Sequence, residues 1–272
     1  MGALLSGCRV DSRPPVPPAV VAIALPQGAD PFSVEVRRGR AILDATRDSL
    51  PRHTGNALRC TSCHLDGGAR EVLGWRGAYA RFPQYRSRSA SVQTVEDRVN
   101  DCLRRSLNGK GLPADTAPMK AIVAYLAWLS DGVPVTPSRG AGRLTAAFDS
   151  LRPDTVRGSV IYGATCAACH GAEGEGTPLA TPVWGPRSYN IGAGMARHRT
   201  AAAFIRANMP HNAPGTLTPQ EAIDVAGYIN SRQRPDFAAK SADWPRGGAP
   251  TDAPYQTYRS PQGTPQGGPN VQ

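Results

Sequence analysis

The sequence predicts an all-α protein in which two tandem domains are followed by an extended C-terminal tail. The first observation is a CxxCH motif that occurs twice, at Cys60–His64 and at Cys166–His170. The second is that apolar residues at helical spacing surround each motif, whereas strand patterns are absent. The third is the length, because 272 residues are enough for two small domains.

The segments around the two motifs form an internal repeat. RRGRAIL (37–43) precedes the first motif as VRGSVIYGATC (156–166) precedes the second, and each places a glycine before apolar residues. Downstream, APMKAIVAYLAWLS (117–130) parallels TPQEAIDVAGYINSR (218–232), and each segment carries a tyrosine, 61 and 58 residues after the motif histidine. One helix is therefore predicted before each motif and one after it, the second starting with Thr218 as N-cap.

The CxxCH motif is typical of covalent haem c attachment. Its two thiols suit thioether bonds to the porphyrin vinyl groups, and the next histidine can bind the iron. A four-cysteine zinc site is the alternative, but the adjacent histidines and the distance between the pairs disfavour it. We therefore predict two covalently bound haem c groups, held by Cys60, Cys63 and His64 and by Cys166, Cys169 and His170.

The order of helix, CxxCH motif, loops and aromatic-bearing helix resembles the class I cytochrome c fold, present twice. The predicted parts are a leader with a Pro-rich linker (1–30), a first cytochrome domain (31–133), a linker (134–155), a second cytochrome domain (156–234) and a Pro/Gly-rich tail (235–272). We predict that the tail wraps the surface, and we assign it no chemistry.

The net charge of +10 predicts anionic partners. Nucleic acid is not indicated, because the sequence has no dense Lys/Arg run interleaved with aromatic residues. Small oxyanions or an acidic protein fit better.

Haem c attachment outside the bacterial cytoplasm predicts a periplasmic protein. MGALLSGC resembles a lipoprotein cleavage box with Cys8 as the residue that carries the lipid anchor. Only seven residues precede Cys8, too few for a working signal. Either the true start lies upstream or Cys8 is incidental, and both alternatives stay open.

The second ligand of each iron is predicted from its distance to the motif histidine. Class I cytochromes usually place a methionine on the loop before the last helix, and Met209 lies there, 39 residues after His170. Met195, in a Gly-rich loop, is the alternative, and His198 and His211 are weaker candidates. The second iron is therefore predicted to have His/Met ligation.

Cys102 takes the equivalent place in the first half, 38 residues after His64. The nearest methionine, Met119, falls inside the predicted closing helix, where a packing role is expected. Cys102 is therefore the predicted second ligand of the first iron. The alternative is a buried cysteine without a chemical role, which is common in proteins.

The segment around Cys102 is predicted to be a helix over residues 95–108. Thr94 and Asp97 form a capping pair, and Gly109 is the predicted stop. Positions 98, 102 and 106 then share one helix face, which places an arginine and a serine beside the thiol.

These features together resemble the dihaem thiosulfate dehydrogenases and, more distantly, the haem subunit of the sulfur-oxidising Sox complex. The resemblance covers residues 44–255. It rests on RFPQYRSRSASVQTVEDRVNDCLRRSLNGKGLP, GATCAACHGAEGEGTP, PVWGPRSYNIGAGM and AAFIRANMP with LTPQEAIDVAGYINSRQRPDF. It implies that haem 1, with His/Cys ligation, is the active site and that haem 2 passes electrons out. It also implies that Arg88, Arg98 and Ser106 bind the anionic substrate beside Cys102.

The implied reaction joins two thiosulfate ions into tetrathionate. It removes two electrons, which two haems can store. Two dianions at about 6 Å repel by about 10 kcal/mol at an effective dielectric near 20, so guanidinium groups are needed nearby. Lys110 is a weaker candidate for this role, and Arg86 and Arg104 are predicted to be solvated.

The electron acceptor implied is a soluble cytochrome c or a high-potential iron–sulfur protein. Two alternatives are a dihaem carrier without catalysis and a Sox-like subunit that acts within a complex. The sequence leaves open the preferred direction of the reaction, the physiological electron partner and the oligomeric state.

Overall fold

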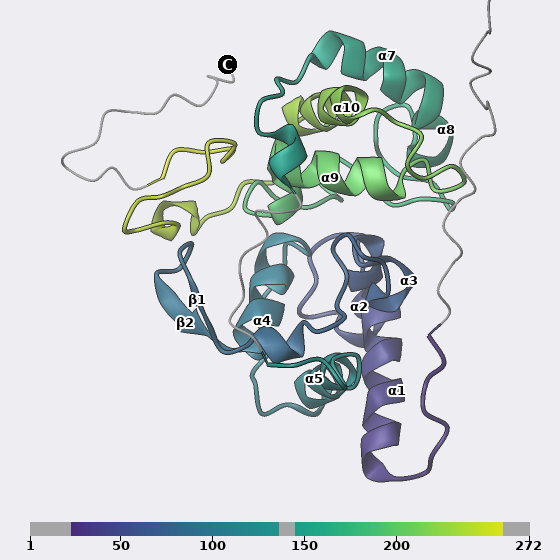
Figure 1. The fold of residues 1–272 in the computed structure, drawn as a ribbon, viewed down its shortest axis with the longest axis vertical. Helices are drawn as coiled ribbons and strands as arrows, with labels where there is room; N and C mark the ends of the chain where they lie inside the picture. The colour runs from purple at the N-terminus through teal and green to yellow at the C-terminus, as the bar shows by residue number, and fades with distance from the viewer. Residues whose placement is uncertain (1–22, 136–144, 258–272) are drawn as a thin grey trace, which may run out of the picture.

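The computed structural model describes residues 23–135 and 145–257 (Figure 1). The first half contains α1 (Pro31–Asp44), α2 (Thr46–Ser49), η1 (Cys60–Ser62), α3 (Leu65–Gly68), η2 (Tyr79–Arg81), β1 (Gln84–Arg86), β2 (Ser91–Gln93), α4 (Val95–Arg105) and α5 (Ala117–Trp128). The second contains η3 (Ala146–Phe148), α7 (Thr155–Thr165), α8 (Ala167–His170), η4 (Gly194–Ala196), α9 (His198–Asn208) and α10 (Pro219–Ser231), and η5 (Lys240–Ala242) follows. The prediction of two tandem helical domains is confirmed.

Each domain is built on one close crossing between its first and last long helix. A Cβ added to Gly39 of α1 would lie 2.0 Å from the Ala121 carbonyl oxygen and 2.9 Å from Cβ of Tyr125, both on α5. A Cβ on Gly158 of α7 would lie 2.1 Å from the Asp224 carbonyl oxygen and 3.0 Å from Cβ of Tyr228 on α10. Only glycine permits this approach of two helix backbones. The internal repeat read from the sequence is therefore a repeat in space.

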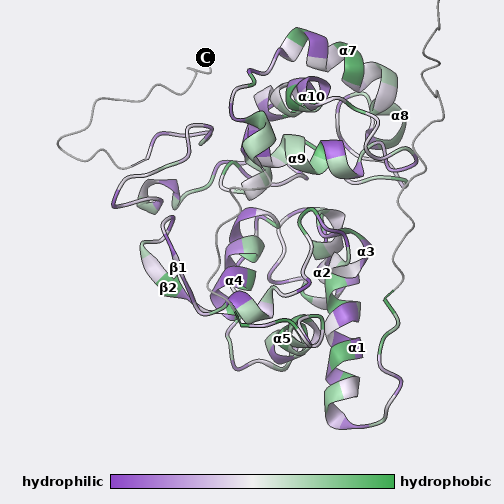
Figure 2. Cartoon of the chain, viewed as in Figure 1, coloured by the Kyte–Doolittle hydropathy of each residue, from purple (hydrophilic) through white to green (hydrophobic). Residues whose placement is uncertain are grey.

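The two domains have separate cores that meet at one loop. The apolar residues of α1, α4 and α5 form the first core, and those of α7, α9 and α10 form the second. Figure 2 shows that the helices of both domains carry hydrophobic and hydrophilic stretches. Tyr189, Ala193 and Ala196 come from the second half of the sequence but belong to the first core, and Met195 contacts both cores. This loop therefore fixes the two domains against each other.

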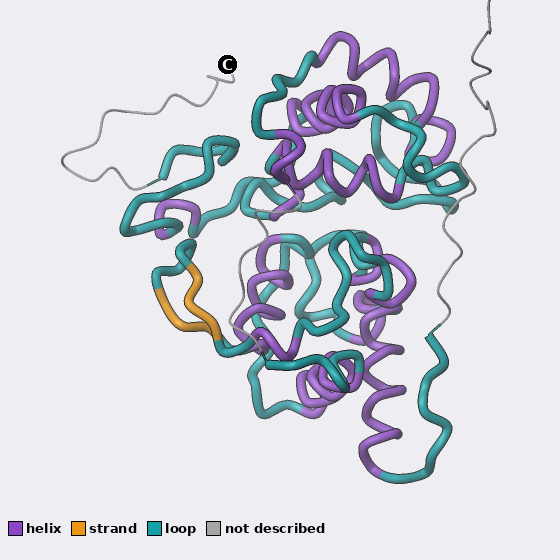
Figure 3. The backbone as a smooth tube through the Cα atoms, in the orientation of Figure 1, coloured by secondary structure: helices purple, strands orange, loops and turns teal. Residues whose placement is uncertain are grey.

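The prediction that strands are absent is wrong in one place. β1 and β2 pair antiparallel, with Gln84 opposite Gln93 and Arg86 opposite Ser91, and the hairpin lies at the edge of the first domain (Figure 3). Each strand has only three residues, which is too short for an alternating pattern to be recognised in the sequence. The hairpin leads directly into α4.

The start of α4 is confirmed and its end is not. Thr94 and Asp97 form the predicted capping box at the N-terminus. The helix ends at Arg105 rather than at residue 108, because the Leu107 N–H donates to the Cys102 carbonyl and widens the last turn. The residue after the helix with a positive φ, of 50°, is Asn108 and not Gly109. Gly109 instead allows a close approach, since its Cβ would lie 2.0 Å from the His53 carbonyl oxygen.

The start of α10 is as predicted, with Thr218 as N-cap and Pro219 in the first turn. The exact domain boundaries stay a prediction. None of the helices in the described part of the chain is long and apolar enough to span a membrane. Cys8 lies outside the described residues.

The C-terminal segment from residue 235 to residue 257 returns to the first domain. It lies beside the β1–β2 hairpin in Figure 1. The Trp244 N–H donates a 2.7 Å hydrogen bond to the carbonyl of Arg88, which lies two residues after the end of β1. The tail was predicted to wrap the surface, and this segment of it contacts the hairpin of the first domain.

Candidate functional site

The first CxxCH motif holds its histidine in one orientation. Nδ1 of His64 hydrogen-bonds to the Leu73 carbonyl, and the imidazole stacks on Trp75 with ring centroids 4.5 Å apart. Burial lowers the pKa of His64 to about 4, which keeps the ring neutral as a metal ligand must be. With Nδ1 engaged, Nε2 remains for an iron atom.

The second CxxCH motif repeats this arrangement. Nδ1 of His170 lies 2.8 Å from the Thr181 carbonyl oxygen, which again leaves Nε2 for a metal. The four motif cysteines are free thiols, and burial raises the pKa of Cys60 and Cys63 to about 12 and that of Cys166 to about 11. Both donor sets therefore fit a covalently attached haem.

The two cysteine pairs do not form a shared zinc site, because they lie in different domains. Within residues 23–135 and 145–257, no group of three His, Cys, Asp or Glu side chains is placed to hold a metal ion. The donors that the sequence provides thus act as two separate sets.

Cys102 lies beside the first motif, as the repeat predicted. Burial raises the pKa of Cys60 and of Cys63, and the electrostatic interaction with Cys102 adds to the rise in both, so the Cys102 sulfur is close to both motif thiols. Nη1 of Arg98 donates a 3.1 Å hydrogen bond to Cys102 Sγ across one turn of α4. The structure therefore gathers the motif, the extra thiol and a guanidinium in one place.

Ser106 follows α4 directly on the same face. Its N–H donates a 2.8 Å hydrogen bond to the Cys102 carbonyl, and its own carbonyl accepts one of 2.8 Å from Asn56 Nδ2. Asn56 also donates to the Ser188 carbonyl at 3.0 Å, which ties this end of α4 to the second domain.

Arg88 is engaged by the C-terminal segment. Its Nε donates to Asp243 Oδ2 at 2.9 Å, its Nη2 donates to the Tyr255 hydroxyl at 2.7 Å, and it lies over the Trp244 ring at 4.6 Å. Arg105 of α4 donates two further hydrogen bonds of 2.7 Å to the same carboxylate. Asp243 therefore joins the hairpin, α4 and the C-terminal segment.

Asp243 holds this cluster together as a buried carboxylate, only 3 % exposed. Burial on its own would raise the pKa of Asp243, but hydrogen bonds from Arg105 and Tyr255 and the charge of Arg88 outweigh it and lower that pKa. Asp243, Trp244 and Tyr255 were not predicted from the sequence, because no local pattern links them to a helix more than a hundred residues away.

Arg86 also differs from its prediction. It was expected to be solvated, but it is half-buried on β1, and burial followed by the charge of Arg98 lowers its pKa. Arg104, given the same prediction, is exposed. The two arginines differ because one belongs to the hairpin that the sequence pattern did not reveal.

The two candidate methionines occupy different environments. Met209 directly follows α9 and is half-buried against the second core, in the domain of His170. Met195 packs between the two cores, and its carbonyl accepts a 3.0 Å hydrogen bond from Asn230. Met119 is fully buried on α5, as expected of a packing residue.

Two family profiles match the two domains. The profile described as "SoxA/TsdA, cytochrome c domain" matches residues 51–135, and that described as "Cytochrome C oxidase, cbb3-type, subunit III" matches residues 153–229. The thiosulfate dehydrogenase of Allochromatium vinosum is 41 % identical over 233 residues, covering 82 % of this chain and 86 % of the relative. The chain belongs to the thiosulfate dehydrogenase family.

Two further members of the thiosulfate dehydrogenase family extend this comparison. The protein of Psychrobacter arcticus is 40 % identical over 230 residues, covering 82 % of this chain and 70 % of its own length. The solved TsdBA structure from Marichromatium purpuratum has 39 % identity and a TM-score of 0.67, and the match covers 78 % of this chain. This chain spans about half of that structure's chain, 48 % of it.

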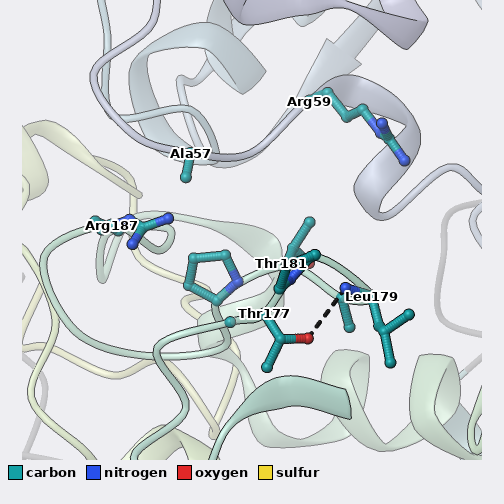
Figure 4. A pocket seen from close by; sticks show the side chains of 10 residues that line it. Ala57, Arg59, Thr177, Leu179, Thr181 and Arg187 are labelled. Atoms are coloured by element: carbon teal, nitrogen blue, oxygen red, sulfur yellow. Dashed lines mark hydrogen bonds between the residues drawn. The ribbon is translucent and has the colours of Figure 1, made fainter.

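As a family member with two cytochrome c domains, the chain carries two covalently bound c-type haems. A cavity of about 500 Å³ opens between the two motif regions (Figure 4). Ala57 and Arg59, just before the first motif, line one side. The other side includes Thr177 and Thr181, and the carbonyl of Thr181 is the one that orients His170. The cavity thus lies between the two haem-binding segments.

Proposed function

We propose that this chain oxidises two thiosulfate ions to one tetrathionate ion and two electrons, with Cys102 as the reacting residue. The observation that carries the proposal is the 3.1 Å hydrogen bond from Arg98 to Cys102 Sγ, beside the first CxxCH motif. A guanidinium favours the thiolate form of a cysteine. A chain that only relayed electrons would have no need of this pair.

Cys102 and His64 would hold the iron of haem 1, and His170 with Met209 would hold that of haem 2. When bound, each of the two haems can accept one electron. The environments of the two methionines support Met209, which lies wholly within the second domain. This ligand set is part of the proposal.

The reaction at Cys102 is proposed in two steps. The thiolate sulfur first forms an S–S bond with the sulfane sulfur of one thiosulfate, and two electrons leave. The sulfane sulfur of a second thiosulfate then attacks that sulfane sulfur, the bond to Cys102 breaks, and tetrathionate leaves with the thiolate restored. No proton is taken up or released, so the residues must stabilise charge rather than move protons.

Charge is the main obstacle to the second step, since a thiosulfate dianion must approach the adduct on Cys102, which itself carries a negative sulfonate group. We propose that Arg98 binds sulfonate oxygens with forked hydrogen bonds and that Ser106 donates another from the same helix face. Arg88 is included from the family resemblance, although its guanidinium is largely engaged by Asp243 and Tyr255. The net charge of +10 favours the arrival of such anions.

We further propose a periplasmic location and a soluble cytochrome c or a high-potential iron–sulfur protein as electron acceptor. The two c-type haems support export, because this haem is attached outside the cytoplasm. A lipid anchor at Cys8 would add membrane attachment.

A steady-state assay of the purified dihaem protein with thiosulfate and an artificial one-electron acceptor tests the function. We expect one tetrathionate for every two acceptor molecules reduced. An electron carrier would show reduced haems but no tetrathionate, and that result would end the proposal.

A further inference from the structure

The hairpin presents one of its faces to α4. Along β1, Gln84 and Arg86 are half-buried while Tyr85 between them is 54 % exposed, as the alternation of a strand requires. Gln93, which pairs with Gln84, is buried and its Nε2 lies 3.3 Å from Asp101 Oδ2 on α4. Arg86 therefore points from the hairpin toward the helix that carries Cys102.

The guanidinium of Arg86 has no counterion in the described structure. Among residues 23–135 and 145–257 it makes no ion pair and no side-chain hydrogen bond. The carboxylate whose charge acts on Arg86 is that of Asp101, which already accepts a hydrogen bond from Gln93 and lies 3.7 Å from Arg105 Nε. The charges of Arg98 and Cys102 also act on Arg86, so the three side chains are close together.

This arrangement costs free energy unless an anion occupies it. Two half-buried guanidinium groups, Arg86 and Arg98, repel each other, and the Cys102 sulfur accepts a hydrogen bond from Arg98 only. Arg88 is different, because Asp243 and Tyr255 satisfy its guanidinium. The hairpin thus carries Arg88, which is bound by the C-terminal segment, and Arg86, which has no ion pair among the described residues.

We propose that Arg86 is a thiosulfate-binding residue that, together with Arg98, holds a sulfonate group beside Cys102. The inference rests on the proposed function and adds a residue to its site. A guanidinium presents a fork that matches two sulfonate oxygens, and two such groups offset the charge of a dianion. A carboxylate of the haem 1 porphyrin is the other anion with suitable chemistry, so the experiment must separate the two.

The test compares Arg86→Gln with Arg104→Gln in the full dihaem protein. Arg104 is an exposed arginine of α4, so its variant loses the same charge and controls for the long-range field. KM and kcat are measured with thiosulfate, and the dissociation constant of sulfate, a dianion that is not oxidised, is measured by calorimetry. The midpoint potential of haem 1 is measured by spectroelectrochemistry.

We expect Arg86→Gln to raise both KM for thiosulfate and the sulfate dissociation constant about 10- to 100-fold, with kcat changed less than about threefold. Arg104→Gln should change KM, kcat and the sulfate dissociation constant by less than about twofold each. Arg86→Lys should recover part of the affinity, because it keeps the charge and loses the fork.

Equal sulfate affinity in Arg86→Gln and Arg104→Gln would overturn the inference. A shifted haem 1 potential in Arg86→Gln with unchanged sulfate affinity would also overturn the inference, because it would mean that Arg86 binds the porphyrin carboxylate. A wild-type protein that binds sulfate but forms no tetrathionate would refute the proposed function alone, and the difference in sulfate affinity would still decide the role of Arg86.

Discussion

Nη1 of Arg98 lies 3.1 Å from Sγ of Cys102, one helical turn further along α4. The pair stands on a helix whose first turn is fixed by Thr94 and whose last turn is held to the second domain through Asn56. The thiol and its guanidinium are therefore presented by a rigid element, which is what a reaction between two anions requires.

Replacing Cys102 by alanine should abolish thiosulfate oxidation while both haems remain attached. The covalent attachment depends on the four motif cysteines, whereas the proposed reaction depends on the sulfur of Cys102. Tetrathionate production should fall by at least about a thousandfold, and electron paramagnetic resonance should show a changed signal for haem 1 only. Full activity in a protein with two haems would show that the sulfur has no chemical role.

Replacing Arg98 by glutamine should remove both the hydrogen bond to the Cys102 sulfur and the proposed contact with the substrate. We expect kcat/KM to fall about 10- to 100-fold, since one charge-assisted hydrogen bond to sulfur and one to the substrate are lost. The exposed Arg104→Gln variant is the control for net charge. Similar values of kcat/KM for the two variants would mean that the contact with Cys102 has no effect on the reaction.

Met209→Ala should remove a ligand from haem 2 and lower its midpoint potential, because methionine ligation raises the potential of a haem. Met195→Ala, a loss of similar volume between the two cores, should leave the potential and the spectrum of haem 2 close to those of the unmodified protein. Redox titration with visible spectroscopy distinguishes them. If the effects are reversed, Met195 is the ligand.

Asp243→Asn should loosen the C-terminal segment from the hairpin. Removing this buried charge leaves Arg88 and Arg105 without their shared partner, and we expect a loss of about 3 kcal/mol in the free energy of unfolding. Urea unfolding followed by circular dichroism measures it. A neutral effect on unfolding would mean that the segment is held by Trp244 and its neighbours instead.

The same carboxylate predicts an acid dependence. Its pKa in the folded protein is lowered below the ordinary value of 3.8, so its stabilising contribution is present above about pH 4 and is lost as the pH falls through the folded pKa. The stability difference between wild type and Asp243→Asn should therefore shrink below pH 4. A difference that stayed constant down to pH 2 would contradict this origin.

Gly158→Ala should destabilise the second domain, because the new methyl group would lie 2.1 Å from the Asp224 carbonyl oxygen and push α7 from α10. We expect a loss of about 2–3 kcal/mol in the free energy of unfolding. Gly163→Ala on the same helix meets no atom within 4 Å and should stabilise by about 0.5–1 kcal/mol. Thermal unfolding of both variants gives the comparison, and equal effects would mean that the crossing is not tightly packed.

Local patterns in the sequence determined much of this protein. The two CxxCH motifs and the capping residues Thr94 and Thr218 specify chemistry and helix starts within a few neighbouring residues. The similar distances of Cys102 and Met209 from their motif histidines, 38 and 39 residues, predicted where Cys102 would lie. Such features are readable because their physical cause acts over one or two helical turns.

Only the tertiary structure decided which arginines have partners. Arg86 and Arg88 are two residues apart, yet in the described part of the chain Arg86 has no counterion, whereas Arg88 is bound by Asp243, 155 residues further along the chain. The hairpin that carries both arginines and the C-terminal segment that binds one of them are held by contacts between distant parts of the chain. Ion pairing depends on such distances in space, and a sequence does not display them.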